Sequence, residues 1–189
     1  AVGHDHGLIR TERLDRLAMR QVDSGFRRAP EQRADGVRRL AKLMELSSGI
    51  YFGDDAGVQQ QLADATTGEL PGLLTTVRFR CTERVFRFLR EGLQRYPLNQ
   101  MRFSKPLPGD RWRQPAKAPV LLEPIFGDSH PFPMELDLPP WTVARDVDFR
   151  RWLFGYGADV LIERPQSLLE DYLVFANSVG LLHKSTAQS

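Results

Sequence analysis

The chain has a single cysteine and no long hydrophobic run, and each absence excludes a class of protein. Cys81 is the only cysteine among 189 residues, so an internal disulfide is excluded. No stretch approaches the roughly 20 apolar residues of a membrane helix, and no basic-then-apolar secretory leader is present. With 41% hydrophobic and 26% charged residues, the composition is that of a globular protein. We therefore expect a cytoplasmic protein without a membrane partner.

The sequence also lacks the motifs that carry catalysis or bind metal. It contains no glycine-rich phosphate loop followed by Lys-Ser or Lys-Thr, no Gly-x-Ser-x-Gly and no His-Glu-x-x-His. Its four histidines, His4, His6, His130 and His183, do not have the paired spacing of a zinc site. We expect a protein that is not an enzyme and that binds neither a metal nor a cofactor.

The net charge of +2 conceals a segregation of charge along the chain. Residues 1–45 carry ten Lys or Arg and seven acids, whereas residues 46–77 carry four acids and no Lys or Arg. Residues 78–113 carry ten Lys or Arg and three acids, and residues 114–189 carry six and ten. Such alternating blocks indicate opposed surface patches that can meet an anion or a second copy of the chain, although solvated faces give the same pattern.

Hydrophobic periodicity divides the chain into two folded regions. In residues 1–52 it predicts two arginine-bearing strands, an amphipathic helix and a short buried strand, over Leu8–Leu14, Leu17–Asp23, Pro30–Leu46 and Ile50–Phe52. Residues 53–72 are rich in glycine and acids and predict a linker, with room for a short helix around Val58–Ala65.

Residues 73–189 predict a second domain with the order β-α-β-β-α-β, which is typical of a ferredoxin-like unit. The expected elements are a strand over 74–81, a helix capped by Thr82, strands at Asn99–Lys105 and Phe132–Leu138, an extra strand at Val120–Phe126, a helix over Asp146–Tyr156 and a strand over Asp159–Glu163. Trp152 and Leu153 are expected in its core. A final helix over Pro165–Leu182 has a wide apolar stripe, which packs on its own domain or reaches a partner; we favour the first.

Two runs of residues carry a family resemblance. Ile9–Leu17 is a strand with arginines, and Phe149–Pro165 is a helix ended by Gly155 and Gly157 and followed directly by a strand. Together they resemble the C-terminal half of WYL-domain transcription regulators of bacteria.

The resemblance implies an α+β protein built from part of an SH3/Sm-like β-barrel, the WYL domain, and a ferredoxin-like C-terminal extension called WCX with an extra helix. It implies a regulatory, ligand-sensing and dimerising half that lacks the N-terminal helix-turn-helix domain through which relatives bind DNA. Arg10, Arg13 and Arg16 match the arginines that bind a nucleic-acid or nucleotide-like anionic effector in that family. Glu12 stands where the family has an aromatic residue.

Two other functions are compatible with the sequence. In the first, residues 78–113, here called the basic block, bind single-stranded nucleic acid directly, because phosphate recognition requires only clustered positive charge. Its candidate contacts are Arg78, Arg80, Arg84, Arg87, Arg102, Arg111 and Arg113. In the second, the chain is an accessory protein that modulates an effector of a phage-defence system.

Overall fold

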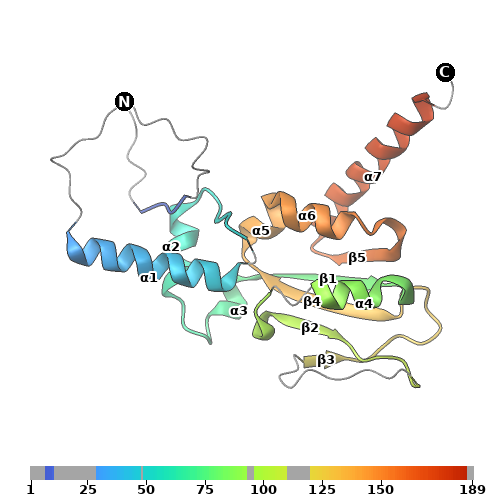
Figure 1. Ribbon diagram of the computed structural model, residues 1–189, viewed down its shortest axis with the longest axis horizontal. Helices are drawn as coiled ribbons and strands as arrows, with labels where there is room; N and C mark the ends of the chain where they lie inside the picture. The colour runs from blue at the N-terminus through green and yellow to red at the C-terminus, as the bar shows by residue number, and fades with distance from the viewer. Residues whose placement is uncertain (1–6, 11–28, 48, 93–95, 110–119, 187–189) are drawn as a thin grey trace. The chain divides into compact units, whose positions relative to one another are not determined.

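The computed structural model describes residues 7–10, 29–47, 49–92, 96–109 and 120–186. The predicted α+β class is confirmed, because helices accompany one five-stranded mixed sheet (Figure 1). The chain divides into two compact units, residues 1–73 and 74–189. None of the helices in the described part is long and apolar enough to cross a membrane.

The first unit contains three helices, α1 (Pro30–Leu46), α2 (Ala56–Asp64) and α3 (Leu70–Leu73). The residues of α1 are those that the periodicity predicted, with Pro30 in the first turn, where a missing N–H costs nothing. Asp55 caps α2 by accepting hydrogen bonds from the N–H groups of Gly57 and Val58. Leu43 and Leu46 of α1 are buried, as are Leu62 of α2 and Phe52 between the helices.

Two predictions in this unit differ from the structure. Ile50–Phe52 is not a strand, because the Phe52 carbonyl accepts a hydrogen bond from the side chain of Gln59 instead of a neighbouring strand. Leu8–Arg10, the described part of the first predicted strand, is also irregular. The rest of that prediction, residues 11–14, and the predicted strand Leu17–Asp23 lie outside the described residues. Residues 53–72, the predicted linker, contain α2, close to the short helix expected around Val58–Ala65, and most of α3.

The second unit is built on strands β1 (Thr75–Cys81), β2 (Met101–Ser104), β3 (Val120–Leu122), β4 (Phe132–Leu138) and β5 (Val160–Arg164). Their order in the sheet is β3-β2-β4-β1-β5. The pairs β2–β4, β4–β1 and β1–β5 are antiparallel, and β3 is parallel to β2. Every strand predicted here is present, although β3 is shorter than expected.

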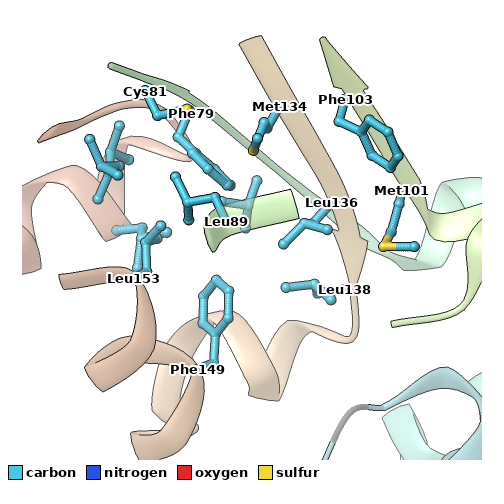
Figure 2. Packing of buried hydrophobic residues seen from close by; sticks show 14 of the residues in the cluster. Phe79, Cys81, Leu89, Met101, Phe103, Met134, Leu136, Leu138, Phe149 and Leu153 are labelled. Carbon is cyan, nitrogen blue, oxygen red and sulfur yellow. The ribbon is translucent and has the colours of Figure 1, made fainter. Parts of the chain in front are cut away.

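Side chains alternate between the two faces of this sheet, as the period of two requires. Val77, Phe79 and Cys81 of β1 are fully buried, and so are Met134 and Leu136 of β4. They pack against Leu89 of α4 (Glu83–Gly92) and against Phe149 and Leu153 of α6 (Val147–Phe154), so both helices lie on one face (Figure 2). The opposite face carries the charged residues of the same strands.

The predicted end of α6 is confirmed. Gly155 follows its last residue, and a Cβ there would lie 2.9 Å from the Arg151 carbonyl oxygen, a distance that real Cβ atoms do not reach. Gly157 has φ +54°, in the left-handed region that favours glycine. The two glycines therefore let the chain turn directly into β5. The structure adds a short helix that the sequence did not predict, α5 (Pro140–Arg145).

Helix α7 (Gln166–Thr186) follows β5 and projects from the sheet of the second unit (Figure 1). Leu168 is buried, and Leu169 and Tyr172 pack against the core. The later apolar residues are exposed: Leu173, Val174, Phe175, Val179, Leu181 and Leu182. The favoured expectation, packing on its own domain, therefore applies to the beginning of α7.

Replacement of Trp152 by alanine should destabilise the second unit, so that it unfolds at a lower denaturant concentration. The indole lies 6.0–6.4 Å from four other rings, those of Phe79, Tyr96, Phe149 and Tyr156. Losing these contacts should reduce the free energy of unfolding by about 3 kcal/mol. Denaturant melts followed by circular dichroism measure the change. Phe88→Ala is the control, because Phe88 is 64% exposed, and an unchanged midpoint for Trp152→Ala would contradict the assignment.

Candidate functional site

The described part of the arginine strand, Gly7–Arg10, is held by two side chains from the helices of the first unit. The amide of Gln59 accepts a hydrogen bond from the Ile9 N–H at 2.8 Å and donates one to the Ile9 carbonyl at 2.9 Å. Its nitrogen also donates to the Phe52 carbonyl at 2.9 Å, and Gln59 is completely buried. Gln59 thus takes the place of a neighbouring strand and sets the path of the backbone into Arg10.

The second anchor of this segment is Arg39 of α1. Its Nη2 donates to the Gly7 carbonyl at 2.8 Å, and only 7% of Arg39 is exposed. Gly7 has φ +99°, so a residue with a side chain would be strained at this position. Arg39 lies one helical turn before Leu43, which explains why it faces the interior of the unit.

The structure describes one of the three predicted effector-binding arginines. Arg10 is exposed at the end of the anchored segment, while Arg13 and Arg16 lie outside the described residues. Gln59 and Arg39 were not predicted as parts of this site. The signal available for Gln59 was its position three residues before Leu62, on the buried side of α2.

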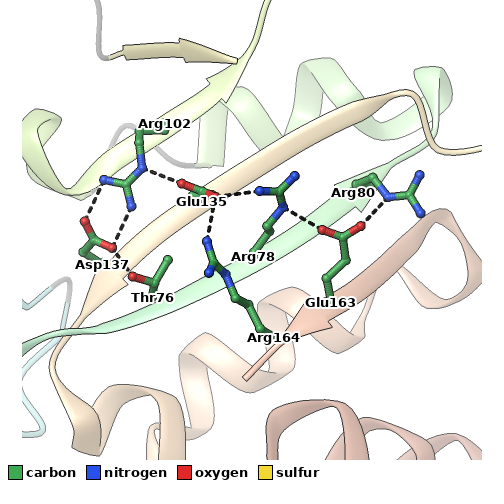
Figure 3. Close-up of polar contacts among 8 residues, drawn as sticks. All are labelled: Thr76, Arg78, Arg80, Arg102, Glu135, Asp137, Glu163 and Arg164. Carbon is green, nitrogen blue, oxygen red and sulfur yellow. Dashed lines mark hydrogen bonds and ion pairs between the residues drawn. The ribbon is translucent and has the colours of Figure 1, made fainter. Parts of the chain in front are cut away.

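The predicted nucleic-acid contacts Arg78, Arg80 and Arg102 lie together on the charged face of the sheet (Figure 3). Arg102 contacts Glu135 at 2.6 Å and both carboxylate oxygens of Asp137 at 2.7 Å. Arg78 pairs with Glu135 at 3.1 Å and Glu163 at 2.7 Å, and Arg80 pairs with Asp128 at 2.6 Å. The three arginines are thus engaged with carboxylates.

A bulge in the pairing of β1 with β5 extends this network. The register shifts between Arg78 and Phe79, so Glu163 has no opposite residue and Arg164 lies opposite Arg78. Glu163 binds Arg78 and also Arg80, at 2.6 Å, while Arg164 donates to Glu135 at 2.9 Å. The bulge therefore brings two consecutive side chains of β5 to the charged face.

The ion pairs change the protonation equilibria of the carboxylates. Burial tends to raise the pKa of Glu135 and of Asp137, but the hydrogen bonds from Arg102 and the other favourable contacts outweigh it, so both pKa values are lowered. The hydrogen bond with Asp137 in turn raises the pKa of Arg102. The pKa of Asp128 is lowered by the backbone N–H of His130 and by Arg80. These carboxylates are therefore ionised at neutral pH and compensate the arginines.

The other four predicted nucleic-acid contacts of the basic block differ in whether a carboxylate pairs with them and in whether the structure describes them. Arg84 pairs with Asp159 and is largely exposed. Arg87 is exposed on α4, and within the described ranges no carboxylate pairs with it. Arg111 and Arg113 lie outside the described residues.

Cys81 and His130 are side chains of types that often serve catalysis or metal binding. Burial, with a contribution from Asp159, raises the pKa of the Cys81 thiol to about 12, so this thiol is not a nucleophile at neutral pH. His130 is held between Ser129 and the Ala158 carbonyl. Within the described part of the chain, no group of three His, Cys, Asp or Glu side chains is arranged to hold a metal ion.

Comparisons of the chain with family models, with curated proteins and with solved structures gave no match.

Acid should destabilise the second unit by removing the ion pairs of its charged face. Glu135 and Asp137 have pKa values below their ordinary 4.5 and 3.8, so their stabilisation is complete at neutral pH and is lost as pH falls below about 5. Arg102→Gln should cost about 2 kcal/mol at pH 7, because it leaves Asp137 partly buried without its cation.

Thermal melts between pH 7 and pH 3 should show that this difference shrinks as the carboxylates are protonated. The matched control is Lys105→Gln, which removes a more exposed ion pair, with Glu123. A difference between wild type and Arg102→Gln that does not depend on pH would contradict the account.

Proposed function

We propose that this chain is the ligand-sensing and dimerising half of a transcription regulator of the WYL-domain kind. The observation that carries the proposal is the topology of the second unit. Its elements β1, α4, β2, β4, α6 and β5 follow one another as β-α-β-β-α-β, and their strands lie in the order β2-β4-β1-β5. All three pairings among them are antiparallel, as in a ferredoxin-like domain.

The segment from α6 through β5 supports the same interpretation. The resemblance rested on a short helix, a Gly-Ala-Asp turn and a strand, and the chain has α6, a turn of 3-10 helix at Gly157–Asp159 and then β5. We interpret the second unit as a WCX-like domain with β3 as an additional edge strand and α7 as the extra C-terminal helix.

The first unit would supply the sensor. Gln59 and Arg39 anchor the segment that leads into Arg10, so the backbone of the proposed binding strand is held by the helices that follow it. The partial SH3/Sm-like barrel, residues 1–52, is part of the proposal, as are contacts of Arg10, Arg13 and Arg16 with an anionic effector. Guanidinium groups suit such an effector because their planar fork matches phosphate oxygens.

Dimerisation would use α7. The helix has 21 residues and is therefore about 31 Å long, and only its first turns pack on the core of the second unit. Val174, Leu181 and Leu182 are each 66–69% exposed, which is costly in water for a helix that remains single. A second copy would cover these residues. Effector binding near Arg10 would then alter the relative orientation of the two subunits and thereby the spacing of the DNA-binding domains.

Replacement of Val174 and Leu181 by glutamate should convert a dimer into a monomer. The two residues lie seven positions apart and share one face of α7, so charges there would oppose pairing. Sedimentation velocity at tens of micromolar measures the change. His183→Glu is the control, because it also adds a negative charge, but on the opposite side of the helix. A wild-type chain that sediments as a monomer would refute this part of the proposal.

A second candidate function, direct binding of single-stranded nucleic acid, is favoured by one feature of α4. Arg87 and Phe88 are adjacent and exposed, and an arginine beside an aromatic ring can contact a phosphate and stack on a base. The carboxylate partners of Arg78, Arg80, Arg84 and Arg102 weigh against it, because phosphate would have to displace each pair.

Titration of a labelled single-stranded pentanucleotide at two salt concentrations separates the two functions. We expect Arg10→Gln/Arg13→Gln to reduce the affinity at least about tenfold and to flatten the salt dependence, because phosphate contacts are lost. Arg84→Gln/Arg87→Gln should leave both unchanged. The reverse result would favour the second candidate, and no binding by wild type would refute an oligonucleotide effector.

A further inference from the structure

The interior of the first unit contains an arginine that contacts no carboxylate of the described residues. Arg39 is 93% buried, since its exposure is 7%. Its guanidinium has five N–H donors, and among the described residues the acceptor that it contacts is the Gly7 carbonyl, through Nη2. Within the described ranges, its Nε is buried and has no hydrogen-bond partner.

A buried charge in this situation is expensive. Desolvation of an ion costs several kcal/mol unless an opposite charge and hydrogen bonds compensate it. The neighbouring residue Arg38 shows the usual solution, because it is exposed and pairs with Asp35 at 2.8 Å and Asp64 at 3.1 Å. Asp64 also accepts from Gln60, so this acid is already engaged, and Arg39 has only a weak effect on its pKa from a distance.

The location of Arg39 connects it with the proposed effector site. Its contact with Gly7 lies three residues before Arg10, and three residues of extended chain span at most about 11 Å. Gln59 holds the backbone between these two positions. Arg39 and Arg10 therefore belong to one anchored part of the first unit, the one buried and the other at the surface.

We propose that Arg39 is the inner cation of an anion-binding site and binds a phosphate group of the effector. The inference rests on the proposed sensing function and names the ligand group together with a residue that the family pattern did not supply. A phosphate oxygen at Nε and Nη would use the remaining donors and neutralise the buried charge, while Arg10 would contact the outer part of the same ligand. Binding of the anion would then stabilise the fold as well as signal.

Inorganic pyrophosphate is a suitable probe because it presents the phosphate chemistry without a base or sugar. We expect it to raise the melting temperature of the full chain by about 5 °C when it is present well above its dissociation constant. Arg39→Gln keeps a donor for the Gly7 carbonyl but removes the charge, and its melting temperature should not respond to pyrophosphate. Arg38→Gln is the matched control on the same helix and should respond like wild type.

A measurement on the wild-type chain makes the test independent of how well Arg39→Gln folds. In a ¹⁵N spectrum, the Nε–H resonance of Arg39, assigned by its loss in Arg39→Lys, should shift as pyrophosphate is added. An unmoved resonance, or an equal rise of melting temperature in Arg39→Gln, would overturn the proposal.

The outcomes also separate this inference from the proposed function. If the pentanucleotide binds through Arg10 and Arg39→Gln binds it equally well, the sensing function stands and the inner site is refuted. If pyrophosphate binds through Arg39 while no oligonucleotide binds, the anion site stands and the oligonucleotide effector is refuted.

Discussion

The structure of the second unit depends on the sorting of side chains across its sheet. Alternate residues of β1 and β4 are apolar and pack under α4 and α6, and the residues between them are charged or polar, apart from Pro133. Burial of one face supplies the hydrophobic stabilisation, at roughly 25 cal/mol per Å² of apolar surface. The same alternation gathers Arg78, Arg102 and Glu135 on the other face, where they must compensate one another.

Because of these ion pairs, the basic block is less positive in the structure than its sequence indicates. In the sequence, residues 78–113 carry ten Lys or Arg and three acids, a pattern typical of a nucleic-acid surface. In the sheet, acids from β4 and β5, more than 30 residues away along the chain, lie beside these arginines. Charge density along the sequence therefore overstates the positive potential of this face, because strand pairing brings opposite charges together.

The first unit presents the opposite case. Arg39 is an ordinary residue in an arginine-rich helix when it is considered along the sequence, and its neighbour Arg38 is indeed an exposed, paired surface residue. In the tertiary structure, Arg39 donates to the Gly7 carbonyl and only 7% of it is exposed, so it is a buried cation. The proposed inner anion site depends on this local arrangement, whereas the proposed sensing function rests on the topology of the second unit and on Arg10.

The sequence by itself determined the elements whose signals are local. The bounds of α1 follow from the spacing of its apolar residues and from Pro30, the end of α6 from Gly155 and Gly157, and β1 and β4 from a strict period of two. The α+β class followed from these elements. Only the tertiary structure decided which polar groups meet, because hydrogen bonds and ion pairs join residues distant in sequence. Gln59 bonds to Ile9 and Phe52 in place of a neighbouring strand, and the bulge at Glu163 completes the charged face. The partners of Gln59 and Glu163 have no local signature in the sequence.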